Sequence, residues 1–297
     1  MASCPLCQGT SHRPLYAGTV PSDGHDPAAY FGSSRLRTGH LPVVQCMGCD
    51  LVMSNPQDDP DTLVRVYAGN VDSAYEAEHE NRRRAALRHL ALVEKYQAPP
   101  ARILDVGCAT GIFVSTAQQN GWRATGLDAS EWMITAGRQR CPMATFRIGT
   151  TDQVAFPAHS FEVITLWDVL EHVPAPLATL ERVRDWLAPE GWLFLSLPNR
   201  ASLPVRVMGS SWVLLLREHL WYFSPATMEK ILARAGFELV RTQPKLVQFS
   251  FANVFARLAQ YPGRFSAAAE RLSRMSALKR MRLLFPIGEM DVVARPR

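Results

Sequence analysis

Residues 104–111 read LDVGCATG, and this stretch decides the expected fold. An apolar run over 101–106 contains one acid, Asp105, and passes directly into a loop of small residues. The segment that follows, 112–119, is compatible with a helix. A strand, a glycine-containing turn and a helix N-terminus in this order commonly hold a ligand. The identity of that ligand is the first question that the sequence raises.

Strand-like runs recur after this loop, and helix-like runs lie between most of them. The runs are 102–106, 123–127, 144–148, 161–167, 192–197, 237–242 and a last strand within 288–296. Strands that alternate with helices predict an α/β fold with a parallel sheet and crossover helices. In such a sheet the ligand lies beyond the carboxyl ends of the strands, where the loop at 105–111 is expected.

The loop matches neither of the two common phosphate-binding patterns. It has no lysine, which a Walker loop requires, and only Gly107 and Gly111 fit the spacing of a dinucleotide loop. Asp105 would repel a pyrophosphate but favours a cation. A second acid, Asp128, ends the next strand and can accept both hydroxyls of a ribose. A nucleoside with a cationic tail satisfies both acids, and S-adenosylmethionine (SAM) is such a molecule.

At this point the sequence resembles the class I SAM-dependent methyltransferases. The resemblance rests on ILDVGCATG at 103–111, GLDAS at 126–130, FEVITLWDVLEHV at 161–173, LAPEGWLFLSLPN at 187–199 and HLWYFSPATMEKILARAGFELV at 219–240. It implies a Rossmann-like, seven-stranded sheet with an antiparallel last strand. The implied cofactor-binding residues are Asp105, Gly107, Cys108, Ala109, Gly111, Asp128, Ala129, Thr150, Thr151 and Trp167.

Two of these positions depart from the pattern of the family. Ala109 stands where the motif often has glycine, which is a mild change because a methyl group is small. Thr150 stands where the family usually has an acid that contacts the adenine amino group. Because Thr150 carries no charge, this contact is expected to pass to Asp152 or to the backbone at Thr151.

The N-terminal region contains two C-x-x-C pairs, Cys4 with Cys7 and Cys46 with Cys49. Two residues between cysteines allow both thiolates to reach one tetrahedral metal from a tight turn. We expect these four residues to bind a structural zinc ion; the alternative is a pair of chance or redox C-x-x-C motifs.

The expected organisation has three parts. A zinc-binding module over 1–55 precedes a helical linker over 56–98, where Asp61 or Thr62 is expected to cap the first helix. The methyltransferase domain follows over 99–297. Two segments interrupt the alternation of strands and helices in this domain. Residues 200–220 are expected to form an apolar wall over the acceptor, and residues 248–285 contain a stripe of apolar residues at helical spacing. Packing inside the protein is expected for that stripe; a homodimer contact or a membrane surface are the alternatives.

Two histidines follow strands on the expected ligand side of the sheet. His172 lies in DVLEHV and His219 in REHLWYFS, and either could remove the proton of a methyl acceptor. The alternative is a histidine that only makes hydrogen bonds within its loop. A catalytic metal near Asp168 and Asn199 is disfavoured, because a hard cation prefers more oxygen ligands than these strand ends offer.

The composition excludes few functions. Net charge is +5, and the basic clusters at 81–84 and 257–282 are expected to be solvated helix surface. No apolar run approaches the ~20 residues that span a bilayer and no signal region is visible, so a cytoplasmic location is expected.

The expected activity is methyl transfer from SAM to an oxygen or carbon of a small molecule. The resemblance extends to bacterial sugar methyltransferases and enzymes of natural-product clusters, so a sugar or secondary metabolite is the expected acceptor. An RNA methyltransferase is one alternative, although the sequence [DN]PPY of nitrogen-methylating enzymes is absent after 161–167. A non-catalytic zinc adaptor with a vestigial cofactor fold is the other.

Overall fold

The computed structural model describes residues 3–20, 39–69, 71, 78–250, 266–273, 275 and 282–297, although it leaves out the side chains at 248–250, 266–269 and 282–283. These residues belong to two compact units, Met1–Gln243 with Gly288–Arg297, and Pro244–Ile287. The first unit contains both motifs described above, the small-residue loop and the cysteine pairs. It therefore carries the candidate site.

A seven-stranded sheet forms the centre of the first unit, and its strand order is β10-β11-β8-β7-β4-β5-β6. The strands are β4 (Arg102–Val106), β5 (Arg123–Asp128), β6 (Thr145–Ile148), β7 (Phe161–Trp167), β8 (Leu187–Pro198), β10 (Phe237–Ser250) and β11 (Arg282–Pro296). Strands β4 to β8 pair in parallel, whereas β11 is antiparallel to β8. The predicted α/β sheet with an antiparallel last strand is therefore confirmed.

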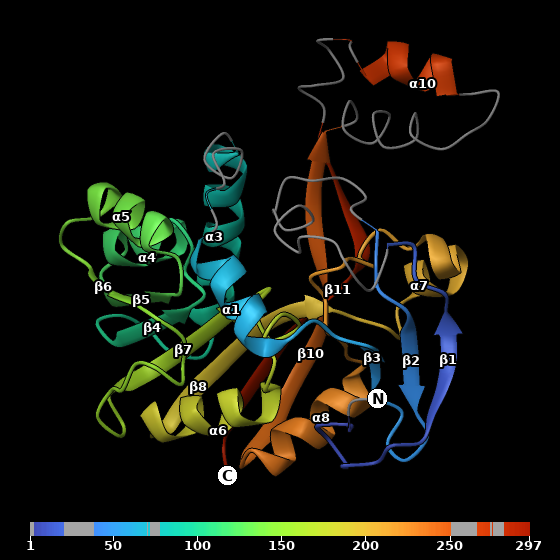
Figure 1. The fold of residues 1–297 in the computed structure, drawn as a ribbon. Coiled ribbons are helices and arrows are strands. Elements are labelled where there is room, and N and C mark those ends of the chain that lie inside the picture. The colour runs from blue at the N-terminus through green and yellow to red at the C-terminus, as the bar shows by residue number, and fades with distance from the viewer. Residues whose placement is uncertain are drawn as a thin grey trace. The chain divides into compact units, whose positions relative to one another are not determined.

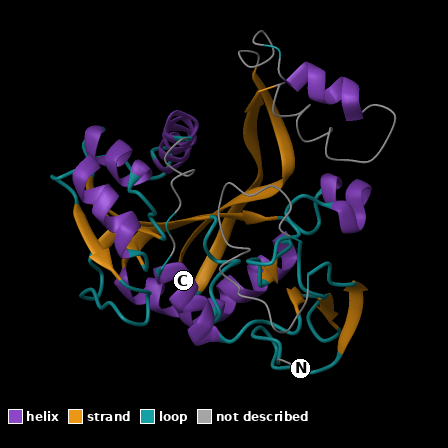
Figure 2. Cartoon of the chain, turned by 45° about the horizontal axis from the view of Figure 1, so that its top comes forward, coloured by secondary structure: helices purple, strands orange, loops and turns teal. Residues whose placement is uncertain are grey.

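Helices cover both faces of this sheet (Figure 1). One face carries α3 (His79–Val93), α4 (Ile112–Gln119) and α5 (Glu131–Arg140), and the other carries α6 (Pro176–Trp186) and α8 (Pro225–Arg234). Figure 2 shows the strands running between these two groups of helices. For α4, α5 and α6 the arrangement follows from the crossover connections, since each of these helices joins two parallel strands and packs on the sheet as it returns. Helix α3 precedes β4 and packs against α4.

Alternate residues of the strands supply two separate apolar cores. Leu104 and Ile164 belong to the core that includes α6 and α8, whereas their neighbours Ile103 and Val163 belong to the core that includes α3 and α4. Successive side chains of a strand point to opposite faces, so a strand buried on both faces must be apolar at nearly every position. This explains the continuous apolar runs in the sequence.

Side-chain caps begin several helices of this chain. Ser224 caps α8 in a capping box with Thr227, and Pro225 occupies the first turn of the helix. The prediction that Asp61 or Thr62 caps the first helix is wrong. In α1 (Pro60–Ala68) the cap is Asp59, whose carboxylate accepts from the Thr62 backbone N–H. Pro60 has no N–H to be satisfied and suits the first helical position, so the helix begins earlier.

A second, four-stranded sheet has the order β1-β2-β3-β9. Three of its strands come from the N-terminal region, β1 (His12–Tyr16), β2 (Val43–Cys46) and β3 (Val52–Ser54). The fourth, β9 (Trp221–Tyr222), comes from the segment directly after His219 and pairs antiparallel with β3. The N-terminal strands and the segment before α8 thus form one sheet.

The segment 200–220 contains α7 (Leu203–Met208), a 3-10 turn η2 (Gly209–Ser211) and the buried Trp212. Trp212 and Leu215 belong to a third apolar cluster with Val43 and Val52 of the small sheet. Val205, Trp212 and Leu215 therefore pack with the N-terminal strands, whereas Leu203 and Val207 of the same segment are exposed.

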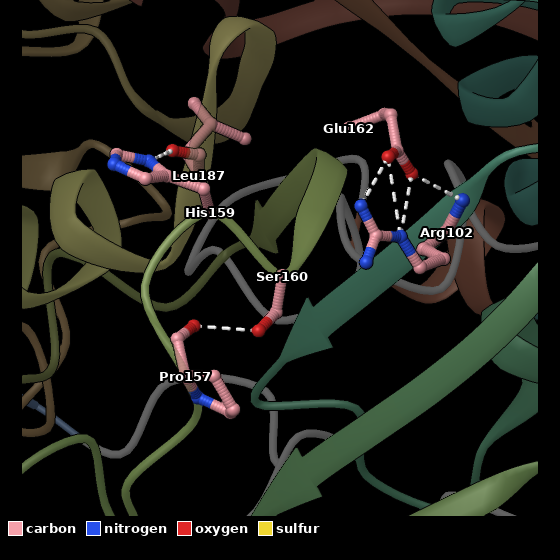
Figure 3. A network of polar contacts seen from close by, with 6 residues as sticks. All are labelled: Arg102, Pro157, His159, Ser160, Glu162 and Leu187. Carbon is pink, nitrogen blue, oxygen red and sulfur yellow. Dashed lines mark hydrogen bonds and ion pairs between the residues drawn. The ribbon is translucent and has the colours of Figure 1, made fainter.

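Charged and polar contacts lie at the amino ends of the central strands of the large sheet (Figure 3). Arg102 begins β4, and both its backbone N–H and its guanidinium donate to the carboxylate of Glu162 in β7. His159 contacts the Leu187 carbonyl with Nδ1 at 2.9 Å. These contacts lie at the amino ends of the parallel strands, opposite the end where a ligand is expected.

The second unit includes the outer parts of β10 and β11 and the helix α10 (Ser266–Ser273). Its described side chains include the exposed Leu246, Leu284 and Phe285. Most of the predicted stripe at 248–285, with its homodimer or membrane alternatives, lies outside the described residues. Among the helices that the structure describes, none combines the length and apolarity that crossing a bilayer demands.

Candidate functional site

The loop after β4 adopts an uncommon backbone conformation. Gly107, Ala109 and Gly111 have φ values of +71°, +46° and +68°. A Cβ atom added at Gly107 would lie 2.5 Å from Cγ2 of Val169, and one at Gly111 would lie 2.8 Å from the Phe146 ring. The two glycines therefore allow both the left-handed backbone and the close approach of neighbouring elements. Alanine at 109 tolerates this conformation at some energetic cost.

Hydrogen bonds hold this loop against the end of β5. The backbone N–H groups of Gly107 and Cys108 both donate to the carbonyl of Leu127, at 2.7 and 3.1 Å. The Gly111 N–H donates to the Cys108 carbonyl at 2.9 Å. The loop is thus a fixed cradle at the carboxyl ends of β4 and β5.

Asp105 lies at the end of β4 and is 4% exposed. Burial raises the pKa of its carboxyl to about 7, the hydrogen bond from the Thr165 hydroxyl opposes this rise, and the charge of Asp128 adds to it. A buried carboxyl with such a pKa is poised to ionise when a cation arrives.

Asp128 ends the neighbouring strand β5, and its two carboxylate oxygens have different partners. One accepts from the Ala109 N–H at 2.8 Å and the other from the Ser130 N–H at 2.9 Å. Burial raises the pKa of this carboxyl as well. Each oxygen accepts one backbone N–H and can accept a further donor, as two ribose hydroxyls would require.

The remaining predicted cofactor residues surround this cradle. Cys108 is buried, burial raises the pKa of its thiol, and a Cβ at Gly126 would lie 2.7 Å from its Sγ. Ala129 lies in the short connection between β5 and α5. Thr150 and Thr151 follow β6, and Thr151 is 6% exposed. The Cys108 side chain therefore fills space in a crowded loop, and its thiol is protonated near neutral pH.

Trp167 ends β7 and is half-buried. Its indole stacks on the imidazole of His89 in α3, with ring centroids 3.9 Å apart, and lies edge-on to Phe113 of α4. The side chain thus faces the α3 and α4 side of the sheet end.

The structure brings the two predicted histidines together. His172 and His219 are 47 residues apart in the chain, yet their ring centroids lie 4.7 Å apart at 73°. Burial lowers the pKa of both, for His219 to about 3. Nδ1 of His172 lies 2.7 Å from the Tyr67 hydroxyl and 3.0 Å from the Glu218 carbonyl. Nδ1 of His219 lies 2.8 Å from the Leu214 carbonyl.

Sequence reasoning missed one member of this cluster, Glu171. Its side chain is 1% exposed, and Oε1 lies 4.0 Å from Nε2 of His172. One ligand atom from each of Glu171, His172 and His219 lies within 4.8 Å of the others, so the three side chains could hold a metal ion. The available signal was the pair of adjacent residues Glu171 and His172 directly after a buried strand.

The four predicted zinc ligands also converge. The Sγ atoms of Cys4, Cys7, Cys46 and Cys49 lie within 4.8 Å of one another, with Cys4 and Cys49 at 3.5 Å and Cys7 and Cys46 at 3.4 Å. Burial raises the pKa of the Cys4 and Cys49 thiols. Four thiols at these spacings fit a tetrahedral zinc ion, which would deprotonate them.

A family model described as a methyltransferase domain matches residues 77–242, more than half of the chain. The chain belongs to this methyltransferase family. The matched region contains the loop cradle, both carboxylates and the histidine pair. The resemblance inferred from the sequence motifs is therefore confirmed.

The chain is similar to two curated proteins that are each named ubiquinone biosynthesis O-methyltransferase. The one from Nitrosospira multiformis is 26% identical over 149 residues, which cover 46% of this chain and 62% of the relative. The one from Xanthomonas campestris pv. campestris is 31% identical over 122 residues, 39% of this chain and 51% of the relative. The chain thus matches less than two thirds of the length of these curated relatives.

Solved structures share the fold at low sequence identity. A SAM-dependent methyltransferase from Thermotoga maritima, described as a possible histamine N-methyltransferase, has a TM-score of 0.51 and 19% identity, covering 75% of this chain and 95% of its own. A chain from the complex of the Haloferax volcanii Trm112 methyltransferase activator with a methyltransferase has a TM-score of 0.55 and 17% identity, covering 75% and 94%. These likenesses show the fold alone.

Proposed function

We propose that the chain transfers a methyl group from SAM to a hydroxyl oxygen of a small molecule. The observation that carries the proposal is a pair of carboxyls whose pKa values burial raises, the buried Asp105 and the half-buried Asp128, at the ends of neighbouring parallel strands around a glycine loop. Both carboxyls are costly to ionise in the free protein, and a ligand with a cationic tail and two vicinal hydroxyls relieves that cost.

The cofactor would be held by this chain's own groups in a definite way. Asp128 would accept the ribose hydroxyls, while Asp105 would balance the positive charge of the methionine part. The wholly buried Thr110 hydroxyl, which has no hydrogen-bond partner within the described ranges, lies in the same loop. Ala129, Thr150, Thr151 and Trp167 are the proposed further contacts, carried over from the resemblance.

The acceptor would lie on the side of His172 and His219. The loop that carries His172 packs on the cofactor cradle, since Val169 touches the position of Gly107. Methyl transfer is an in-line displacement at carbon, so placing the acceptor oxygen against the methyl group provides much of the rate enhancement. The two histidines are the proposed groups on this side that position the acceptor hydroxyl and favour the loss of its proton.

Oxygen is favoured over carbon as the methylated atom because the curated relatives are named O-methyltransferases. A sugar or a secondary metabolite remains the proposed acceptor class, on the resemblance of the zinc-module arrangement. The zinc ion itself is proposed at Cys4, Cys7, Cys46 and Cys49 as a structural ion, because all four thiols serve as ligands and leave no position for a substrate.

The test uses the full chain with SAM that carries an isotopically labelled methyl group. A panel of phenols, sugars and RNA is screened by mass spectrometry for a labelled methylated product. Transfer to a hydroxyl of a small molecule is the expected result, whereas labelling of RNA alone would overturn the acceptor class.

Cofactor binding is measured separately by calorimetry, in Asp128→Asn and in the matched control Asp185→Asn, whose carboxyl is exposed on α6. We expect about tenfold weaker binding or more in the first variant, because a ribose contact of about 1.4 kcal/mol is lost. Equal affinity in the two variants would refute the assignment of the cofactor site.

A further inference from the structure

We propose that Glu171, His172 and His219 form a second metal site, which binds a divalent cation such as Mn²⁺ or Fe²⁺ beside the acceptor. This inference deepens the proposed function, on which its catalytic role rests. It begins from the convergence of three side chains from two separate segments. One ligand atom from each lies within 4.8 Å of the other two, and Glu171 and His219 are 1% and 5% exposed.

The backbone fixes which nitrogen of each imidazole is available. Nδ1 of His219 lies 2.8 Å from the Leu214 carbonyl, and Nδ1 of His172 lies 3.0 Å from the Glu218 carbonyl. A carbonyl oxygen can only accept a hydrogen bond, so each Nδ1 carries the proton. Each Nε2 therefore presents a lone pair, which is the form that binds a metal.

This arrangement is the one that surrounds metal-bound histidines in general. A ligating imidazole almost always donates its second N–H to a backbone carbonyl or a carboxylate, which sets the tautomer and the ring orientation. Both histidines here have such a partner already. For His172 the Tyr67 hydroxyl, 2.7 Å from the same Nδ1, adds a further contact.

Charge also favours a cation at this place. Glu171 brings a carboxylate into a nearly waterless position, with Oε1 4.0 Å from Nε2 of His172. A divalent ion between two neutral nitrogens and one carboxylate leaves a net positive charge, which the nearby charge of Asp168 further reduces.

The ligand types indicate which cations fit. Two imidazoles with one carboxylate suit borderline ions such as Mn²⁺, Fe²⁺, Co²⁺ or Zn²⁺, and fit Ca²⁺ or Mg²⁺ poorly. Three protein ligands also leave coordination positions open, as in catalytic sites. The four-cysteine cluster differs on both counts, so the two sites can be told apart by the metals they bind.

A cation here would serve methyl transfer directly. The acceptor hydroxyl binds it and loses its proton to solvent, because coordination lowers the pKa of a bound hydroxyl. An oxygen lone pair then forms the new bond to the methyl carbon of SAM. The carbon–sulfur bond breaks, its electron pair stays on sulfur, and S-adenosylhomocysteine (SAH) is released as the product.

Hydrogen bonds to the backbone hold the segment with Glu171 and His172 next to the segment with His219. The Glu171 carbonyl accepts from the N–H groups of Leu220 and Trp221, at 2.8 and 3.3 Å. The Ser54 hydroxyl donates to the His219 carbonyl at 2.9 Å. The three proposed ligands are therefore anchored by main-chain contacts on both sides, as a preformed site requires.

The test titrates the zinc-loaded full chain with Mn²⁺, followed by the electron paramagnetic resonance signal of the free ion. Mn²⁺ is the probe because the thiolate site disfavours it. We expect about one Mn²⁺ per chain, with at least about tenfold weaker binding in Glu171→Gln and in His219→Gln. The control His159→Gln removes another histidine that contacts a backbone carbonyl, remote from the site, and should bind Mn²⁺ normally.

SAH binding is measured on the same samples and separates the outcomes. Normal SAH binding without Mn²⁺ binding in the natural chain would overturn the metal site and leave the proposed function standing. Mn²⁺ binding without SAH binding would overturn the proposed function instead. Undiminished Mn²⁺ binding in both Glu171→Gln and His219→Gln would place the ion elsewhere and overturn the ligand set. Each variant counts only if it still binds SAH, which shows that it is folded.

Discussion

The buried carboxyl of Asp105 predicts that cofactor affinity depends on pH. Its pKa is raised to about 7 from an ordinary value of 3.8, with burial as the main cause. SAM brings positive charge to this carboxyl, so only the ionised form binds it well. The free protein must therefore release a proton when the cofactor binds below about pH 7.

The size of the effect follows from that pKa. At pH 6 about one molecule in eleven has Asp105 ionised, and at pH 8 about ten in eleven, so affinity should rise about tenfold between these values. The stability of the free protein should change in the opposite direction. Because the folded-state pKa is above the unfolded one, this group stabilises the fold fully below about pH 4. That contribution, about 4 kcal/mol at most, is lost as pH rises through about 7.

The assay is isothermal titration of SAM at pH 6, 7 and 8, in two buffers of different ionisation enthalpy. About one proton should be released per SAM bound at pH 6. Asp105→Asn, which keeps an oxygen for the Thr165 hydroxyl, should bind more weakly at pH 8 and lose the pH dependence. Asp185→Asn is the matched control and should retain it.

The titration of SAM itself is common to all three proteins, and Asp128 is intact in each. The difference between the natural chain and Asp105→Asn therefore reports the Asp105 carboxyl alone. An affinity that stays constant between pH 6 and 8 in the natural chain would refute the reasoning. So would an identical pH profile in Asp105→Asn.

Three other substitutions test the remaining parts of the molecule. Gly107→Ala should lower the free energy of unfolding by about 1–3 kcal/mol and weaken SAH binding, because φ at this position is +71° and the new Cβ would lie 2.5 Å from Cγ2 of Val169. An unchanged free energy of unfolding in urea would contradict this prediction. Cys46→Ser should reduce bound zinc from about one ion per chain, as measured by metal analysis, and a full zinc content would exclude Cys46 as a ligand. Glu162→Gln should cost only about 1 kcal/mol or less in thermal unfolding, because the pair with Arg102 is 45% and 32% exposed, so a large loss would show that we undervalue this contact.

Much of the large sheet could be predicted because its signals are local. The bounds expected for β4 and β7 match the structure, since each is a continuous apolar run that ends at a turn. The predicted run at 192–197 proved to be only part of β8 (Leu187–Pro198), which includes the turn-like residues Ala188–Gly191. Nothing in the local composition of those residues indicates a strand. They form an irregularity in the pairing with β7, because Leu187 pairs with Phe161 and Trp192 already pairs with Val163.

The candidate site was predictable to the extent that single residues mark strand ends. Asp105 and Asp128 stand at such positions, and periodicity locates strand ends well. His172 follows in the loop after β7. Glu171 could not be recognised in the same way, because a carboxylate next to a histidine acquires meaning only when His219 lies opposite. That contact joins segments 47 residues apart. The segment that carries His219 leads into β9, a strand of only two residues that is too short to be recognised from the sequence.

The pairing of β3 with β9 links the N-terminal strands to the segment that carries His219, on the proposed acceptor side of the site. Ser54 donates a backbone N–H to the Leu220 carbonyl and its hydroxyl to the His219 carbonyl. Asp58 adds a buried ion pair with Arg217 at 2.6 Å. These contacts hold both sides of the segment that carries His219.

The cysteine cluster is tied to the same region through α8. Lys230 and Arg234 donate to the carbonyls of Cys49 and Leu6, so both cysteine-bearing turns contact this helix. Cys4, Cys46 and Cys49 also belong to the apolar core that includes α6 and α8. A zinc ion that fixes these turns would therefore stabilise β3, and through it the position of His219. The zinc ion and the acceptor site would then belong to one packed unit. Loss of zinc should therefore loosen the position of His219 before it affects the cofactor cradle on β4 and β5.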